Sequence, residues 1–127
     1  METGIQGLQE ETVTEELTAK AYGSGELPVY ATPAMIALIE KTAWKSVAPC
    51  LEEGQGTVGT RLEIDHVSAS PVGAHITCRT TLVEIDRRRL VFEAEVTDEA
   101  GVIGKGRHER FIVDNEKFLS KAEAKKG

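Results

Sequence analysis

Residues 32–50 read TPAMIALIEKTAWKSVAPC and predict the one helix that decides the fold. Thr32 can cap the helix N-terminus with its hydroxyl, and Pro33 suits the first helical position because it lacks an amide hydrogen. Pro49 ends the helix, since the residue before a proline avoids the α region. The expected helix is about 16 residues long, a usual length in a globular protein.

The helix is apolar around most of its circumference, which indicates burial on more than one side. Lys41, Lys45 and Ala34 share one narrow sector, and we expect that sector to face solvent. Glu40 lies in a different sector among apolar side chains, with Trp44 rather than a cation at position i+4. A carboxylate there is paired from another element, held neutral by burial, directed into a cleft, or simply solvated.

Composition and charge indicate one globular domain. The chain has 127 residues, of which 40% are hydrophobic and 28% charged, and its net charge is −6. This charge argues against a nucleic-acid partner, although not against an anionic small ligand. Cys50 and Cys78 form neither a disulfide framework nor a metal-binding motif. No apolar run has the length of a membrane span and no secretory signal is visible, so we expect a cytoplasmic protein with no membrane partner.

The sequence predicts a flexible N-terminus, residues 1–10, followed by a single domain, residues 11–127. A first strand is expected at 11–19, a glycine-containing loop at 22–30, and a final amphipathic helix at 115–126. Between the central helix and the final one, apolar and polar residues alternate as they do in half-buried strands. The expected strands are 57–68, 74–85, 90–97 and 102–113.

Short connections between these strands favour antiparallel pairing, and the central helix is the only apolar cover for the sheet. We therefore predict an α+β fold in which an antiparallel sheet wraps around one buried helix. Pairing across a two-fold axis would satisfy the sheet edges, so we expect a homodimer, with a tetramer as an open alternative.

Three dispersed residues carry the groups that acyl transfer requires. Thr32 supplies a hydroxyl at a helix N-terminus that favours an oxyanion, and Glu40 supplies a carboxylate on the same helix. His66 follows Leu62 and Ile64 on the inward side of a strand, where a histidine with a purely structural role is the alternative. The arginines 87–89 could meet phosphates, but a solvated hairpin tip is favoured.

Several short motifs have a familiar spacing. They are VGT at 58–60, PVG at 71–73, RRL at 88–90, GRHER at 106–110 and EKF at 116–118. Together with the spacing of Thr32, Glu40, His66 and Arg110, they make the chain resemble the hot-dog fold. Within that fold, it resembles the family of the fluoroacetyl-CoA thioesterase over about residues 11–120.

The resemblance implies a dimer that hydrolyses short acyl-CoA thioesters without a metal or redox cofactor, coenzyme A entering as part of the substrate. Glu40 would act as nucleophile or general base, Thr32 would orient it or share that role, and His66 would move the proton. Gly59 would leave room for the thioester carbonyl or donate its N–H to it, and Arg110 would help to order the site. We expect the site at the dimer interface.

The loop before the helix departs from the family pattern. The specialised enzyme carries phenylalanines there, whereas residues 23–30, GSGELPVY, contain none. Leu27 and Tyr30 remain as apolar contacts for a substrate, so we expect a short or otherwise different acyl group rather than fluoroacetyl specificity. Two alternatives stay open: a non-catalytic module that binds acyl-CoA, and an enoyl-thioester hydratase. The hydratase is the less favoured, because the central helix has no histidine or aspartate.

Overall fold

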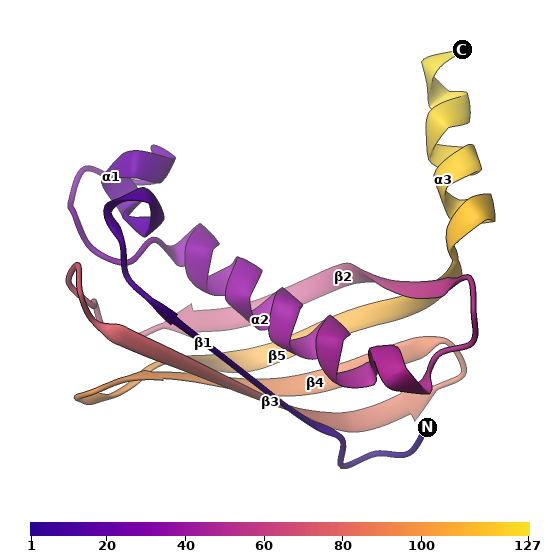
Figure 1. Cartoon of the computed structure of the whole chain (residues 1–127), viewed down its shortest axis with the longest axis horizontal. Helices are drawn as coiled ribbons and strands as arrows, with labels where there is room; N and C mark the ends of the chain where they lie inside the picture. The colour runs from indigo at the N-terminus through magenta and orange to yellow at the C-terminus, as the bar shows by residue number, and fades with distance from the viewer.

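The computed structural model describes all residues 1–127 as a five-stranded antiparallel sheet that curves around one long helix (Figure 1). The sheet order is β1-β3-β4-β5-β2, so β1 and β2 form its two edges. The strands are Gln6–Thr12 (β1), Gln55–His66 (β2), His75–Asp86 (β3), Arg89–Asp98 (β4) and Gly101–Asp114 (β5). This is the predicted α+β arrangement, and the four strands expected after the helix are confirmed.

The helices are α1 (Ala19–Tyr22), α2 (Thr32–Val47) and α3 (Asn115–Glu123), with single 3-10 turns at Glu15–Leu17, Ala48–Cys50 and Ala124–Lys126. The helix α2 lies along the concave face of the sheet, whereas α3 projects away from it (Figure 1). The helices lack the combination of length and hydropathy that a bilayer-spanning segment requires.

The N-terminal region differs from the sequence expectation. Residues 6–10 belong to β1, which pairs antiparallel with β3, instead of being loose. The strand expected at 11–19 is wrong beyond Thr12, because Glu15–Leu17 form a 3-10 turn and α1 begins at Ala19. The inward side of β1 includes Gly7, where a Cβ would lie 2.7 Å from the Thr42 carbonyl oxygen. The other inward residues of β1 are Gln9 and Glu11, so the strand has no inward row of apolar residues that a sequence pattern could reveal.

The helix α2 has the predicted length but a different start. Ala31 takes the N-cap position and makes no side-chain cap, so Thr32 is the first helical residue and Pro33 the second. Ala34 is buried rather than exposed, because residues of the preceding segment, including Val13 and Tyr30, cover this end of the helix. Lys41 and Lys45 face solvent as expected.

Two apolar clusters fix α2 on the sheet. The larger one surrounds Met35 and Ile39 on the N-terminal half, and the smaller one surrounds Ala43 and Val47 on the C-terminal half. Each fully buried large side chain of this kind contributes about 1.5–3 kcal/mol to folding. The opposite face of α2, toward β2, is open: Trp44 is 43% exposed and Leu62 of β2 is 38% exposed.

Gly106 is where β5 approaches the backbone of β2 most closely. Its φ is 155°, and a Cβ there would collide with the Glu63 carbonyl oxygen. Gly104, on the same strand, makes room for Met35 of α2. These two glycines therefore allow β5 to lie close to β2 and to α2.

We predict that Gly106→Ala lowers the free energy of unfolding by about 2 kcal/mol or more, because backbone strain and a collision with β2 act together. The matched control is Gly54→Ala, where φ is 83° and no atom lies within 4 Å of the added methyl group. That control should lose only the conformational part, about 1 kcal/mol. Urea unfolding measures the free energy of unfolding of both variants. Equal decreases in the two variants would contradict a collision at Gly106.

Candidate active site

Thr32 and His66 meet at the N-terminal end of α2. The Thr32 Oγ1 lies 2.7 Å from the His66 Nδ1, at the point where β2 ends. Both residues line a hollow of about 330 Å³ whose other walls are Ala19, Ser24, Val29, Tyr30, Val67, Ser68 and Ala69. Burial lowers the pKa of His66, and its Nε2 is buried without a hydrogen-bond partner. This imidazole is therefore neutral at pH 7 and able to take up a proton.

Glu40 lies two turns further along α2, where it is paired with a cation from another element. The Arg110 NH1 of β5 donates to the Glu40 Oε2 over 3.2 Å. The Arg110 side chain is only 6% exposed, whereas that of Glu40 is 38% exposed. The sequence left several environments open for Glu40. In the structure its carboxylate is paired with Arg110 of β5 and is also partly exposed to solvent.

Arg110 is held by β2 as well as by α2. Its Nε donates to the Thr57 Oγ1 over 2.8 Å, and its NH2 donates to the Thr57 carbonyl oxygen over 2.9 Å. Its NH1 also lies 3.1 Å from the Nε2 of His108, a fully buried residue of β5. His108 and Thr57 were not among the site residues that the sequence indicated. The available signal was the i, i+2 spacing of His108 and Arg110, which puts both on the inward face of one strand.

Gly59 makes room for the Glu40 carboxylate. A Cβ at this position would collide with the Glu40 Oε2 and would lie 3.3 Å from both the Arg110 NH1 and the His108 Cε1. The ladder between β2 and β5 shifts register between Gly59 and Arg61, so a β-bulge occurs beside this cluster. The structure thus places Gly59 against the predicted carboxylate.

The predicted catalytic residues form two groups within one chain. Thr32 and Glu40 are eight residues apart on α2, which separates them by about 12 Å along the helix axis. His66 contacts Thr32, and Gly59 and Arg110 contact Glu40, but no hydrogen bond joins the two groups. Within one chain, Thr32 therefore contacts His66, and Glu40 contacts Gly59 and Arg110, but these two groups do not contact each other.

The two predicted apolar contacts of the loop differ in position. Tyr30 is 1% exposed and lines the hollow, while its hydroxyl donates to the Glu11 Oε2 over 2.5 Å. Burial, followed by the Glu11 contact, raises the pKa of Tyr30. Leu27 is 65% exposed and does not line the hollow, so the expectation that it contacts a substrate here is not met by this chain alone.

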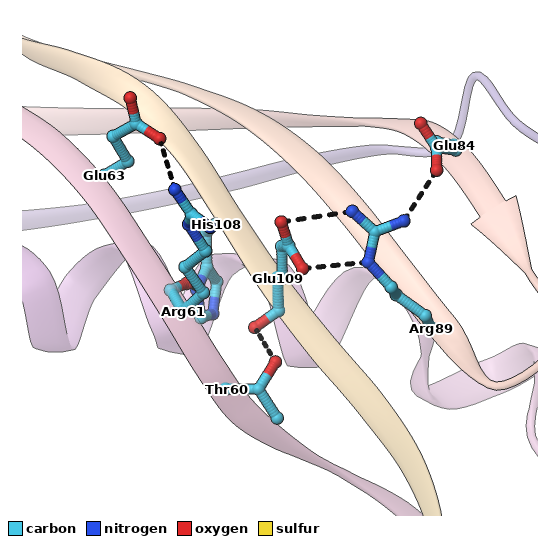
Figure 2. A network of polar contacts seen from close by, with 7 residues as sticks. All are labelled: Thr60, Arg61, Glu63, Glu84, Arg89, His108 and Glu109. Atoms are coloured by element: carbon cyan, nitrogen blue, oxygen red, sulfur yellow. Dashed lines mark hydrogen bonds and ion pairs between the residues drawn. The ribbon is translucent and has the colours of Figure 1, made fainter.

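The outer face of the sheet carries a separate ion-pair network (Figure 2). The Arg89 Nε donates to Glu109 over 2.9 Å and its NH1 donates to Glu84 over 2.7 Å. The Arg89 guanidinium lowers the pKa of the Glu109 carboxyl. Arg87 is exposed at the hairpin tip, as predicted, whereas Arg89 is engaged within the sheet.

We predict that the protein loses stability as the pH falls from 7.5 to 5.0. Burial lowers the pKa of both His66 and His108 from the usual value of about 6.5, so the unfolded chain takes up protons before the folded protein does. The stabilisation is complete above about pH 6.5 and declines below it, toward the lowered pKa values of the folded state. Melting temperatures across this range provide the test, and His66→Asn should make the slope shallower. A flat or rising profile in the wild type would contradict the lowered values.

Comparison with known proteins agrees with this architecture. The chain is 36% identical to the fluoroacetyl-CoA thioesterase of Streptantibioticus cattleyicolor over 97 residues, which cover 76% of this chain and 70% of that protein. A solved variant of the fluoroacetyl-CoA thioesterase in complex with acetyl-CoA superposes with a TM-score of 0.94 at 31% identity, over 100% of both chains. A hot-dog-like protein from Thermanaerovibrio acidaminovorans shares the fold, with a TM-score of 0.90 at 21% identity over 98% of this chain and 93% of that one.

These similarities confirm the hot-dog fold that the sequence motifs predicted. The family model described as fluoroacetyl-CoA-specific thioesterase matches residues 13–116, a range that contains every candidate catalytic residue named above. The chain therefore belongs to the fluoroacetyl-CoA-specific thioesterase family.

Proposed function

We propose that the protein hydrolyses acyl-CoA thioesters that carry a short or small acyl group. The observation that carries this proposal is the contact between the Thr32 hydroxyl and the neutral imidazole of His66 at the start of a buried helix. The solved relative bound to acetyl-CoA supports a short acyl thioester as the substrate class.

The start of α2 suits the carbonyl oxygen of a thioester. Ala31 has no side chain that caps the helix, and the Thr32 hydroxyl is directed to His66. Pro33 has no N–H, so the Thr32 N–H and the helix dipole are the groups available to the negative charge that develops on that oxygen.

The reaction divides into bond changes that these groups can support. A nucleophilic oxygen, from Glu40 or from a water that Glu40 deprotonates, forms a bond to the thioester carbon while the C–S bond breaks. His66 moves the proton that the departing sulfur takes up. If Glu40 is the nucleophile, one water then hydrolyses the acyl–Glu40 anhydride; if water is the nucleophile, its oxygen is already in the product. Either route consumes one water and gives a free carboxylic acid and the thiol of coenzyme A.

We infer that the complete site forms between two copies of the chain. Within one chain, Glu40 and the Thr32–His66 pair are separated by about 12 Å along α2. The edge strand β2 has no neighbour on its outer side, and Trp44 and Leu62 expose apolar surface beside it. Antiparallel pairing of β2 with its own copy, about a two-fold axis near Leu62, brings Gly59 and Glu40 of one chain toward His66 and Thr32 of the other.

We predict that the purified protein releases free thiol from at least one short acyl-CoA in a panel of acetyl, fluoroacetyl, short branched, aryl and longer thioesters. Glu40→Gln and His66→Ala should each lower kcat at least about 100-fold, because general acid–base and nucleophilic groups contribute that much. Glu53→Gln, at an exposed carboxylate of the loop before β2, is the matched control and should retain the wild-type rate. No turnover of any member by folded protein would favour the binding-module alternative.

We also predict that two inactive variants restore activity when they share a dimer. Glu40→Gln and His66→Ala chains are unfolded together and refolded as a mixture. In a site shared between subunits, each mixed dimer has one intact site, so random pairing gives about a quarter of the wild-type rate. Sedimentation confirms that dimers form. Mixed dimers that show no activity would contradict a shared site and place all the groups in one chain.

A further inference from the structure

His108 is a fully buried histidine that takes no part in the proposed reaction. It lies on the helix side of β5, and its ring stacks on Phe92 with the centroids 6.2 Å apart. Its Nδ1 lies 2.8 Å from the Arg61 carbonyl oxygen, and its Nε2 lies 3.1 Å from the Arg110 NH1. Figure 2 shows His108 beside Arg61, beneath the strand that carries both His108 and Glu109.

The two contacts fix a single protonation state. A carbonyl oxygen can only accept a hydrogen bond, so the His108 Nδ1 carries the hydrogen and donates it. A guanidinium can only donate, so the His108 Nε2 is unprotonated and accepts from Arg110. Protonation of Nε2 would direct an N–H at the Arg110 cation, and burial together with this cation lowers the pKa of His108. The ring is therefore a neutral acceptor for Arg110.

The Arg110 NH1 has two acceptors that lie on different elements. One is the Nε2 of His108 on β5 and the other is the Glu40 Oε2 on α2. The remaining Arg110 contacts go to Thr57, through Nε and NH2. His108 is thus the protein contact that fixes the nitrogen facing Glu40.

We propose that His108 is a positioning residue that acts through Arg110 to orient the Glu40 carboxylate. This inference rests on the proposed thioester hydrolysis. Arg110 holds the Oε2 of Glu40, whereas Oε1 makes no hydrogen bond to the protein and the Glu40 side chain is partly exposed, so Oε1 is the oxygen left for the reaction.

The side chains of His108, Arg110 and Glu40 are closely packed, which leaves little room for other arrangements. The β-bulge between Gly59 and Arg61 lies where the Arg61 carbonyl receives the His108 hydrogen bond. A methyl group at Gly59 would press on the Glu40 carboxylate, the Arg110 guanidinium and the His108 ring at once. Loss of the acceptor at His108 would therefore release Arg110 toward other geometries, and small displacements of a catalytic group can cost about 100-fold in rate.

Two substitutions separate the contact with Arg110 from the contact with Arg61. His108→Gln puts an amide oxygen near the position of Nε2, so it can accept from Arg110. His108→Asn reaches only the position of Nδ1, so it can donate to the Arg61 carbonyl but leaves Arg110 without its acceptor. Both replace the ring with an amide, so they have similar costs in packing. Urea unfolding and sedimentation verify that both variants are folded and associate as the wild type does.

The expected result is a difference in kcat without a difference in KM, measured with the best thioester of the panel. His108→Asn should lower kcat about 10- to 100-fold, His108→Gln should stay within about fivefold of the wild type, and KM should change less than about threefold in both. Equal losses of kcat, or a loss that lies in KM, would overturn the positioning role. A wild type that hydrolyses no thioester would overturn the proposed function, and this inference with it.

A second measurement tests the inference in the wild type and so does not depend on the variants being folded. The ¹⁵N NMR shifts of histidine distinguish the two ring nitrogens, and they should show a protonated Nδ1 and an unprotonated Nε2 in His108 between pH 6 and 8. A protonated Nε2 would overturn the inference even if thioesterase activity is present.

Discussion

Burial of the Arg110 guanidinium is the interaction on which the arrangement of the site depends. A buried cation is costly unless its donors are paired, and removal of one partner leaves charge that nothing compensates. The acceptors of Arg110 come from three elements: Thr57 on β2, Glu40 on α2 and His108 on β5. These contacts fix the central helix against β2 and β5.

The helix α2 is therefore held on the sheet by two kinds of contact, apolar packing and the polar contacts of Arg110. The apolar clusters attach it to β3, β4 and β5, through residues such as Ile76, Phe92 and Ile103. The polar cluster attaches it to β2 and β5 and leaves the surface near Trp44 and Leu62 open. The carboxylate and the hydroxyl–imidazole pair both lie along this less covered side. If apolar side chains covered α2 on all sides, the Glu40 carboxylate and the Thr32–His66 pair would be buried without access to a substrate.

The sequence was sufficient to predict the fold class, the central helix and the four strands that follow it, because each has a clear periodicity of apolar residues. It also singled out Glu40 and His66 as candidates, since each is a polar residue in a predicted apolar row, and their catalytic role stays a prediction. The strand β1 could not be predicted because its inward residues, Gly7, Gln9 and Glu11, form no apolar row. Ala34 was placed in solvent because its burial comes from Val13 and Tyr30, which pack on it from a distant segment. His108 was missed because its significance lies in contacts from Arg61 and Arg110, which register and a β-bulge bring together.

The charges on the outer face of the sheet support the proposed pairing of two copies at the edge strand β2 rather than through stacked sheets. Cross-strand neighbours there alternate in charge across four strands, in the order Arg79, Glu95, Lys105 and Asp65. Opposite charges on adjacent strands support the sheet while they remain hydrated, and stacking a second sheet on them would remove that water. Uncovered apolar surface is instead found beside β2, on the helix side of the sheet. The proposed association would bury this apolar surface and pair a free strand edge in one step, at the strand that carries Gly59 and His66.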